Sequence, residues 1–376
     1  CMALLLSGIG MPFAQAKPAV FPVRVQLGST ETVPAAAEDF YLHVNGEWLK
    51  HTTIPSTADR LDGMSEADRQ VKARLQQITA EAAAHQKAGT ANRDEQNIAA
   101  LSACAEDQAG RERVGLGKLA SVLQSIKAIR TPQEYAERMA AISVTLGQSG
   151  LIGSVQVRPD PFSNQAYTVW IDPPALDFPR GVLADPSHEA MFVSYRSYVK
   201  DLLQLYGEDA SAAEHEAAEI FTLQRELAVQ SIAAGQRDLE STALHSWLKK
   251  DVHKLYRSIT IEPVLQASGL GAVPGNQTWY VSDPADIRIA AAQLTPEKLP
   301  VLKAHAIVQL LHEYSSCLPS AYAQLNARYQ QQLKGIASPE ALPQQDQERC
   351  WNLLGEAYGR QYAARYFPAA QGSQVM

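Results

Sequence analysis

The chain has 376 residues, of which 46% are hydrophobic and 19% charged, with a formal net charge of −7. This composition is typical of a globular protein that buries a core, and it excludes a largely disordered chain. The sequence also lacks the concentrated positive stripe with which nucleic-acid-binding proteins displace counterions. The length is sufficient for two or three domains, or for one large helical unit.

A short apolar stretch opens the chain and ends in Ala14-Gln15-Ala16. Small residues in this spacing are typical of the site that signal peptidase cleaves. The stretch falls short of the roughly 20 apolar residues that a membrane-spanning helix needs. We therefore expect residues 1–16 to be the remnant of a secretory signal peptide, with a buried N-terminal segment as the alternative. Residues 17–37 have no helical periodicity and fit a linker.

Helical patterns begin after the linker and return in the second half of the chain. Charges are interleaved with apolar residues from Gly63 to about Ala84, and a second helix is expected around residues 98–104. Residues 131–134 (Thr-Pro-Gln-Glu) combine a capping threonine, a first-turn proline and a capping-box glutamate, which predicts a helix start. The remaining predicted helices cover residues 188–206, 210–234, 241–256, 295–316, 320–333 and 342–366.

The helical pattern is interrupted by two β-prone runs, Ser154–Val157 and Tyr167–Ile171, with a turn-rich segment between them. This arrangement predicts a β-hairpin with a long connection. Four prolines between residues 173 and 186 keep the following stretch extended. Trp279–Val281 fits either a short strand or a turn. The expected fold class is therefore mainly α: a large multi-helix domain with a small β-hairpin.

No catalytic motif is found. A thermolysin-type zinc site needs two histidines four residues apart on one helix, so that both imidazoles reach the metal, with a glutamate beside the first. The nearest match is His215–Glu219, where a glutamate replaces the second histidine. His188-Glu189 and His312-Glu313 also lack a second histidine at this spacing. We interpret all three as ordinary helix residues. A G-x-S-x-G elbow and Gly-rich phosphate loops are absent as well.

Three cysteines follow residue 16, namely Cys104, Cys317 and Cys350, and none of them has C-x-x-C spacing. Export would place them in an oxidising compartment, where a disulfide can persist. Cys317 follows an apolar helical run and lacks the electropositive setting of a catalytic thiol. We expect it to be a buried structural cysteine.

Several separated patches of the sequence are distinctive in composition and order. They are Asp39–Lys50 (Asp-Phe-Tyr-Leu-His-Val-Asn-Gly-Glu-Trp-Leu-Lys) with Ile54-Pro55 after it, Leu101–Cys104, Arg237-Asp238, and Glu348–Cys350 followed by Leu354–Tyr362 and Arg365–Pro368. Together they resemble the neprilysin and endothelin-converting-enzyme family of zinc metallopeptidases from about Glu38 to Pro368. The first and last patches are the specific ones.

The resemblance implies a fold and a separate role for each half of the family's chain. In that family a mostly helical domain, built mainly from the N-terminal half of the chain, covers the active site of a thermolysin-like zinc domain. Residues 38–368 are thus expected to be the N-terminal domain of such a peptidase, and residues 369–376 the truncated start of the zinc domain. The resemblance implies zinc in the full-length enzyme, with no cofactor in this chain.

The resemblance also implies two kinds of site residue. Arg60 matches the substrate-binding arginine of the family, whose planar guanidinium offers two parallel donors to the carboxylate of a short peptide. The alternative is a surface ion pair of Arg60 with Asp59 or Asp62. Cys104 and Cys350 match a family disulfide, which would restrict the unfolded chain by on the order of 5 kcal/mol.

We therefore expect the substrate-access portion of a periplasmic or secreted zinc metalloendopeptidase that acts on short peptides. Alone it would be catalytically incompetent, because the His-Glu-x-x-His motif is absent. Its expected partners are short peptides and the missing C-terminal catalytic domain, with no nucleic acid. One alternative is a free-standing noncatalytic helical module that binds peptides or a partner protein. Another is a helical scaffold of unrelated function with a chance match in its opening patch.

Overall fold

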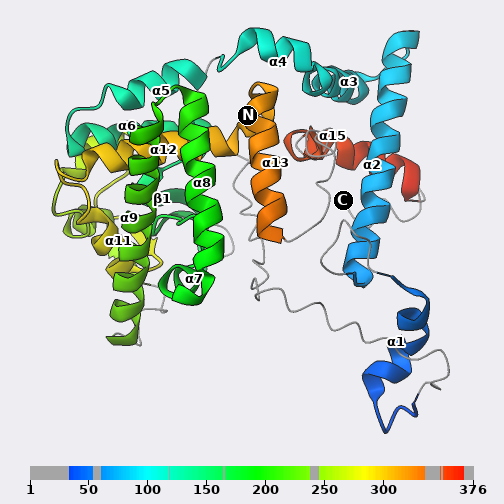
Figure 1. The fold of residues 1–376 in the computed structure, drawn as a ribbon, viewed down its shortest axis with the longest axis horizontal. Coiled ribbons are helices and arrows are strands. Elements are labelled where there is room, and N and C mark those ends of the chain that lie inside the picture. The colour runs from blue at the N-terminus through cyan, green and yellow to red at the C-terminus, as the bar shows by residue number, and fades with distance from the viewer. Residues whose placement is uncertain are drawn as a thin grey trace. The chain divides into compact units, whose positions relative to one another are not determined.

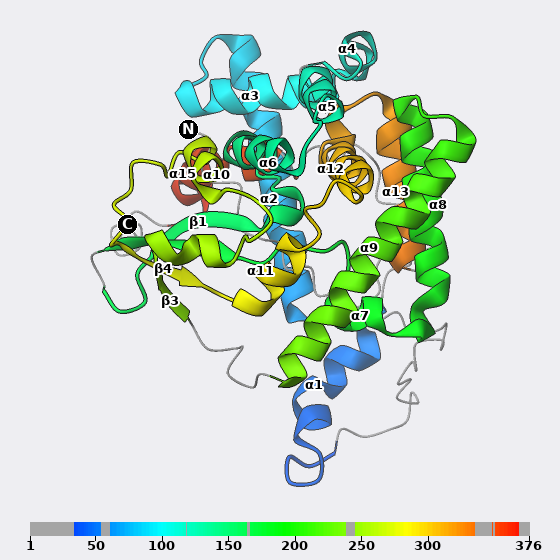
Figure 2. The ribbon, with the colours of Figure 1, turned by 90° about the vertical axis from the view of Figure 1, so that its left-hand side faces the viewer.

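A computed structural model gives the fold (Figures 1 and 2). It describes residues 34–53, 61–117, 119–163, 166–237, 245–334, 348 and 350–367. The described part is mainly helical with one small sheet, which confirms the expected fold class. It divides into two compact units, residues 108–329 and residues 34–107 with 330–367. The predicted boundaries at residues 38 and 368 stay predictions.

The first unit contains most of the helices and the whole sheet. Its helices are α4 (Gln108–Val114), α5 (Leu119–Lys127), α6 (Pro132–Leu146), α7 (Arg180–Ala184), α8 (Glu189–Tyr206), α9 (Ala210–Arg237), α10 (Ile261–Ala267), α11 (Pro284–Ala291), α12 (Leu299–Glu313) and α13 (Ser320–Lys334). Single 3₁₀ turns lie at Gly150–Ile152, Pro186–His188, Lys249–Lys254 and Ser315–Cys317.

The start of α6 follows the sequence prediction. The Thr131 hydroxyl accepts a hydrogen bond of 3.1 Å from the Glu134 amide, and Pro132 occupies the first turn. The Glu134 carboxylate reaches one residue further back than a capping box requires and accepts from the Arg130 amide at 2.8 Å. The first bond satisfies one of the amides that a helix start leaves without partners, and the second holds the residue before the cap.

The core of this unit is centred on three helices, α8, α9 and α12, which contact one another (Figure 1). α12 buries ten residues around its whole circumference, as expected of a helix inside a core. α8 contributes an aromatic face, on which the rings of Phe192 and Tyr195 pack edge-on against Phe178 at 6.0 and 5.2 Å. The apolar contacts of these helices provide a large share of the burial in the unit.

The sheet has the strand order β1-β2-β4-β3. β1 (Ser154–Pro159) and β2 (Tyr167–Asp172) form the predicted antiparallel hairpin, which is confirmed. β4 (Thr278–Val281) pairs with β2 in parallel, so residues 279–281 are a strand. α6 and α10 lie over one face of the sheet (Figure 2), where Ile171 is buried.

The prediction of a helix over residues 241–256 is wrong. Residues His245–Leu248 form β3, which pairs antiparallel with β4, and a 3₁₀ turn follows. The pairing places Trp247 opposite Trp279, which is fully buried. Because strand preference depends on cross-strand packing, a local pattern did not reveal this strand.

The second unit joins residues from both parts of the chain. Its helices are α1 (Phe40–His51), α2 (Gly63–Ala88), α3 (Arg93–Glu106) and α15 (Gly355–Tyr366). Its core consists of Ile78, Ala82, Ile98, Trp351, Ala357 and Tyr358. Across both units, none of the described helices is long and apolar enough to span a bilayer.

Gly153 shows how tightly the hairpin is held against its surroundings. Its φ is +89°, and a Cβ there would lie 2.7 Å from the carbonyl oxygen of Asp172. We predict that Gly153→Ala lowers the free energy of unfolding by roughly 2–4 kcal/mol, through left-handed strain and the backbone clash together. Urea denaturation followed by circular dichroism measures the change.

Gly147 provides the matched control in the same unit. Its φ is +74°, but nothing lies within 4 Å of the added Cβ. Gly147→Ala should therefore show only the conformational cost, about 1 kcal/mol. If both substitutions lower the free energy of unfolding by the same amount, the clash with the Asp172 carbonyl oxygen does not contribute, which would contradict the prediction.

Candidate functional site

Arg60, the predicted substrate-binding residue, lies outside the described residues. The structure does describe the helix start that follows it. Asp62 caps α2, where its Oδ1 accepts from the Ser65 amide at 2.7 Å and from the Ser65 hydroxyl at 2.8 Å. This cap fixes the backbone two residues after Arg60, and the role of Arg60 itself stays a prediction.

The three His-Glu pairs of the sequence do not form a metal site. His215 and Glu219 are both exposed on α9. His188 lies 3.8 Å from Asp185, and His312 Nδ1 lies 2.8 Å from the Tyr198 hydroxyl. Within the described ranges, no three His, Cys, Asp or Glu residues are placed to hold a metal ion. The described residues therefore do not fit the zinc that the family resemblance implies.

The cysteines occupy different environments. Cys350 is buried, and its Sγ lies 3.9 Å from the Leu101 carbonyl oxygen on α3, one helical turn before Cys104. Cys104 is exposed, and the two are present as thiols, so their disulfide stays a prediction. The expectation that Cys317 is buried is wrong. α12 ends at Glu313, and the 3₁₀ turn that follows places Cys317 at the surface.

A buried polar cluster that no sequence motif indicated lies in the core of the first unit. Asp177, in the proline-rich segment before α7, accepts hydrogen bonds through Oδ2 from the Tyr195 hydroxyl and from Gln224 Nε2, the latter at 2.8 Å. Gln224 Oε1 in turn accepts from the Asp177 amide at 2.7 Å. The fully buried His305 of α12 places Nε2 3.6 Å from the same carboxylate oxygen.

The electrostatics of this cluster favour an ionised carboxylate. Burial raises the pKa of Asp177, but interaction with His305 and the hydrogen bonds from Tyr195 and Gln224 outweigh it, so that the pKa lies well below its usual range. Burial and the nearby Asp177 charge raise the pKa of Tyr195, which therefore stays a hydrogen-bond donor. The cluster thus connects α8, α9 and α12 through one partly buried negative charge.

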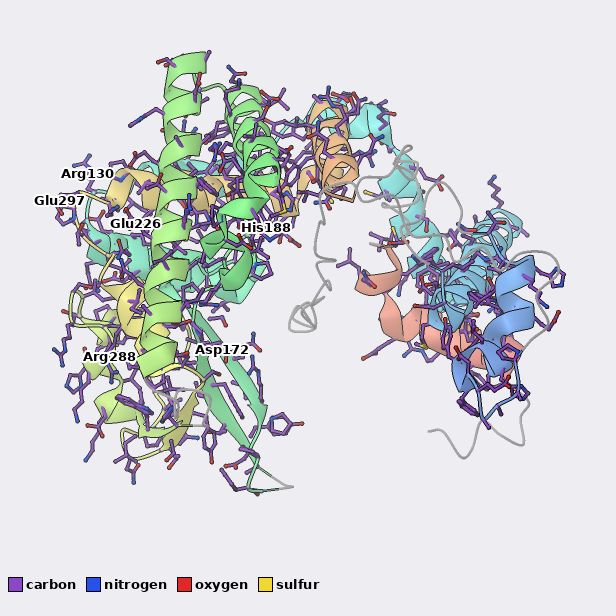
Figure 3. All side chains as sticks on the ribbon, turned by 60° about the horizontal axis from the view of Figure 1, so that its bottom comes forward. Arg130, Asp172, His188, Glu226, Arg288 and Glu297 are labelled. Atoms are coloured by element: carbon purple, nitrogen blue, oxygen red, sulfur yellow. The ribbon has the colours of Figure 1, made fainter. Side chains whose placement is uncertain are left out.

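Other charged residues of the first unit are spread over separate elements (Figure 3). Asp172, at the end of β2, accepts from the Arg158 guanidinium and from the Ser282 hydroxyl. Arg288 lies over the Trp247 ring at 5.7 Å, and Glu226 pairs with Lys298 at 3.2 Å. These contacts connect neighbouring elements and do not converge on a common centre.

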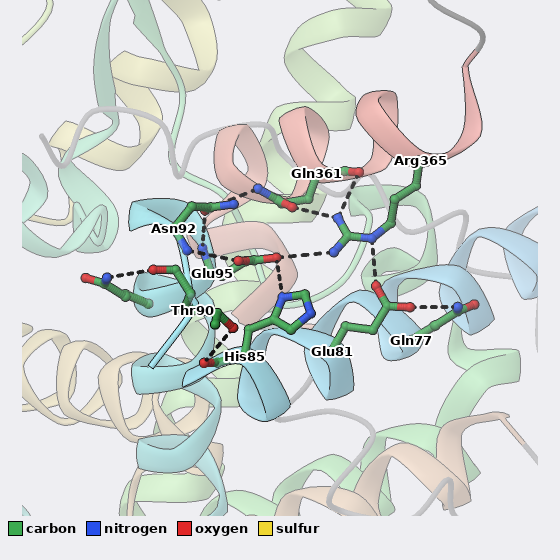
Figure 4. Close-up of polar contacts among 10 residues, drawn as sticks. Gln77, Glu81, His85, Thr90, Asn92, Glu95, Gln361 and Arg365 are labelled. Atoms are coloured by element: carbon green, nitrogen blue, oxygen red, sulfur yellow. Dashed lines mark hydrogen bonds and ion pairs between the residues drawn. The ribbon is translucent and has the colours of Figure 1, made fainter. Parts of the chain in front are cut away.

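A second polar cluster joins α2, α3 and α15 (Figure 4). Glu95 caps α3 in a capping box with Asn92, and its Oε1 also lies 2.9 Å from His85 Nδ1. Arg365 of α15 donates to Glu81 at 2.7 Å and to Glu95 at 3.4 Å. The spacing of Asn92 and Glu95 is a signal that sequence reading could have found.

Neither cluster has the parts of a nucleophilic or acid–base site. A nucleophile with a base in hydrogen-bond reach and a group that orients the base would be needed, next to space for a substrate. His305 is fully buried, the partly buried Asp177 is engaged by Tyr195 and Gln224, and Glu95 pairs with Arg365. Among the residues described, the polar clusters therefore hold helices together.

Solved structures with this fold are bacterial metalloproteases. The zinc metalloprotease Zmp1 of Mycobacterium tuberculosis, in complex with an inhibitor, matches with a TM-score of 0.77 at 20% identity over 94% of this chain and 53% of that one. Its open state matches with a TM-score of 0.72 at 22% identity, over 91% and 53%. PepO of Lactobacillus rhamnosis gives a TM-score of 0.70 at 17% identity, over 91% and 53%.

The fold is thus that of the helical half of metallopeptidases of this type, and the chain spans about half the length of the structures it matches. The sequence model of peptidase family M13 matches residues 36–376, and the chain belongs to that family. The resemblance to the neprilysin and endothelin-converting-enzyme family is thereby confirmed. Comparison with curated proteins finds no match to the sequence.

We predict that Asp177→Asn lowers the free energy of unfolding by roughly 1–3 kcal/mol, because it removes the partly buried charge that faces His305. The native pKa of Asp177 is lowered, so its stabilisation is present above the unfolded-state value of about 3.9 and is lost as the pH falls through the native value. The difference in the free energy of unfolding between wild type and variant should accordingly become smaller in acid.

Glu226→Gln is the surface control, since Glu226 is exposed and its partner Lys298 is partly exposed. This substitution should change the free energy of unfolding by no more than about 0.5 kcal/mol. Guanidinium unfolding curves at pH 7 and in acid measure both variants. An Asp177→Asn protein as stable as Glu226→Gln at pH 7 would rule out a stabilising buried charge.

Proposed function

We propose that this chain is the substrate-access portion of a zinc metalloendopeptidase that acts on short peptides. The observation that carries the proposal is the match to peptidase family M13 over residues 36–376. The fold supports it, because the chain aligns over nearly all of its own length with about half of each matched metalloprotease. A helical layer of this size in front of a catalytic chamber would admit short peptides and exclude folded proteins.

In this proposal the catalytic zinc belongs to the full-length enzyme and is held by residues outside this sequence. The 376-residue chain contains no His-Glu-x-x-His motif. The described residues offer no group of three metal-binding side chains. The chain on its own should therefore bind substrate without cleaving it.

Arg60 is the residue we propose for recognition of the peptide carboxylate. A guanidinium can offer two parallel hydrogen bonds to a carboxylate, which gives both attraction and orientation. The proposal rests on the match of Arg60 to the substrate-binding arginine of the family, two residues before the Asp62 cap of α2.

We predict that the purified chain, supplied with zinc, does not hydrolyse a quenched fluorescent peptide. A noncleavable short peptide with a free carboxylate should bind, and Arg60→Ala should weaken binding about tenfold or more, because a charge-assisted pair contributes at least 1.4 kcal/mol. Isothermal titration calorimetry measures the binding.

Arg69→Ala is the matched control, because Arg69 is an exposed arginine paired only locally with Glu66 on α2. It should leave peptide affinity unchanged. Zinc-dependent hydrolysis by the chain would overturn the access role. Equal affinities of the Arg60→Ala and Arg69→Ala proteins would overturn the role of Arg60. Binding of a partner protein without any peptide binding would favour the noncatalytic module.

We further propose a periplasmic or secreted location, supported by the signal-like residues 1–16. Export would allow Cys104 and Cys350 to form the disulfide that the family resemblance implies. We predict that protein recovered from the periplasm or medium begins after Ala16 and has one reactive thiol when unfolded. N-terminal sequencing and thiol titration test this, and three thiols in exported protein would refute the disulfide.

A further inference from the structure

α15 is attached to its unit in a different way from the core helices of the first unit. Among the described residues, α15 buries only Ala357 and Tyr358, whereas α12 buries ten residues. Tyr358 makes one polar contact to α2, a hydrogen bond of 2.8 Å with the Thr79 hydroxyl. Ala357 and Tyr358 pack in the apolar core of the unit with Ile78 and Ile98, and polar contacts around this core supply the rest of the attachment.

The contacts from α15 to α3 consist of paired charges. Arg360 forms a two-bond fork with Asp94, with Nε to Oδ2 at 2.8 Å and Nη2 to Oδ1 at 2.9 Å. Arg365 Nη2 lies 3.4 Å from Glu95 Oε1. Two-bond pairs of this kind are the strongest and the most geometrically specific of surface ion pairs.

The contacts from α15 to α2 repeat this pattern. Arg365 Nε donates to Glu81 at 2.7 Å, and Glu81 also accepts from Gln77 at 2.8 Å (Figure 4). Arg74 of α2 donates to the Tyr362 hydroxyl at 2.8 Å and lies 4.7 Å from the centre of the Tyr366 ring. Two arginines of α15 thus face three carboxylates, Glu81, Asp94 and Glu95.

The other charged groups around this contact are mostly basic. α2 contributes Arg74 and His85, and α3 contributes Arg93. Lys72 of α2 pairs with Glu348, just before α15, at 2.7 Å, and also with Asp68. Glu356 on α15 lies 3.6 Å from Arg360 but is itself exposed. If the three carboxylates lose their charge, the groups that remain repel one another.

Each of the three carboxylates is stabilised in its ionised form. The hydrogen bond from Arg360 lowers the pKa of Asp94, and hydrogen bonds from Gln77 and Arg365 lower that of Glu81. The Asn92 amide and then His85 lower the pKa of Glu95 against the effect of burial. The attachment is therefore fully present when the pH is above the ordinary carboxyl pKa values of about 3.9–4.3. It is lost as the pH falls through the lowered pKa values of the three carboxylates.

We propose that α15 is an acid-released clasp: when Glu81, Asp94 and Glu95 take up protons, α15 separates from α2 and α3 while the helices of the first unit stay folded. Protonation removes the attraction for Arg360 and Arg365 and leaves them facing Arg74, His85 and Arg93. The core helices α8, α9 and α12 keep their apolar contacts, which do not depend on pH in this way. Release exposes the apolar side chains of Ile78 and Ile98.

Hydrogen exchange with mass spectrometry tests the clasp on the full chain under reducing conditions, between pH 7 and pH 3, with rates corrected for intrinsic exchange. Peptides that cover α15 should lose protection by about tenfold or more relative to peptides of α12 as the pH falls. Protection that decreases in parallel in α12 and α15, or in neither, would overturn the proposal.

A triple variant, Glu81→Gln, Asp94→Asn and Glu95→Gln, removes the charges with little change of shape. Its α15 should already be poorly protected at pH 7 and should show no further loss in acid. Glu66→Gln, which removes an exposed pair with Arg69 away from α15, should keep the wild-type profile. If the triple variant does not fold, Asp94→Asn alone should raise the pH of release, and an unchanged release pH would overturn the proposal.

Discussion

One partly buried carboxylate constrains much of the first unit. Asp177 lies in a proline-rich segment before α7, and its side chain is held by Tyr195 of α8, Gln224 of α9 and His305 of α12. A charge removed from water is tolerated only where such partners surround it. The segment and the three helices must therefore adopt one mutual arrangement, and the sheet and α7 are positioned relative to it.

The two units show two ways of holding helices together. In the first, apolar contacts surround α12, and the polar cluster adds directional contacts at the edge of this core. In the second, two arginines of α15 reach carboxylates on helices more than 250 residues earlier in the chain. The former depends little on solvent conditions, whereas the latter depends directly on pH and salt. α15 buries only two of its residues against ten in α12, so ion pairs contribute more to its attachment than they do for α12.

The sequence predicted the elements whose signals are local. The cap and proline at residues 131–132 indicated the start of α6, and the alternating runs indicated the β1–β2 hairpin. β3 was missed because its strand character comes from β4, more than 30 residues away. Cys317 was misplaced because a turn ends α12 four residues before it. His305 inside an apolar helix was a readable signal, but its partner Asp177 had none, since no motif connects residues so far apart.

The chain belongs to peptidase family M13, and its sequence contains no His-Glu-x-x-His motif. The central claim is that the helical half governs access and leaves metal chemistry to other residues. Elemental analysis of the purified chain, after dialysis against a zinc-containing buffer and then a metal-free one, tests this most directly. The account predicts far less than one zinc ion per chain, and a stoichiometric ion that survives dialysis would contradict it.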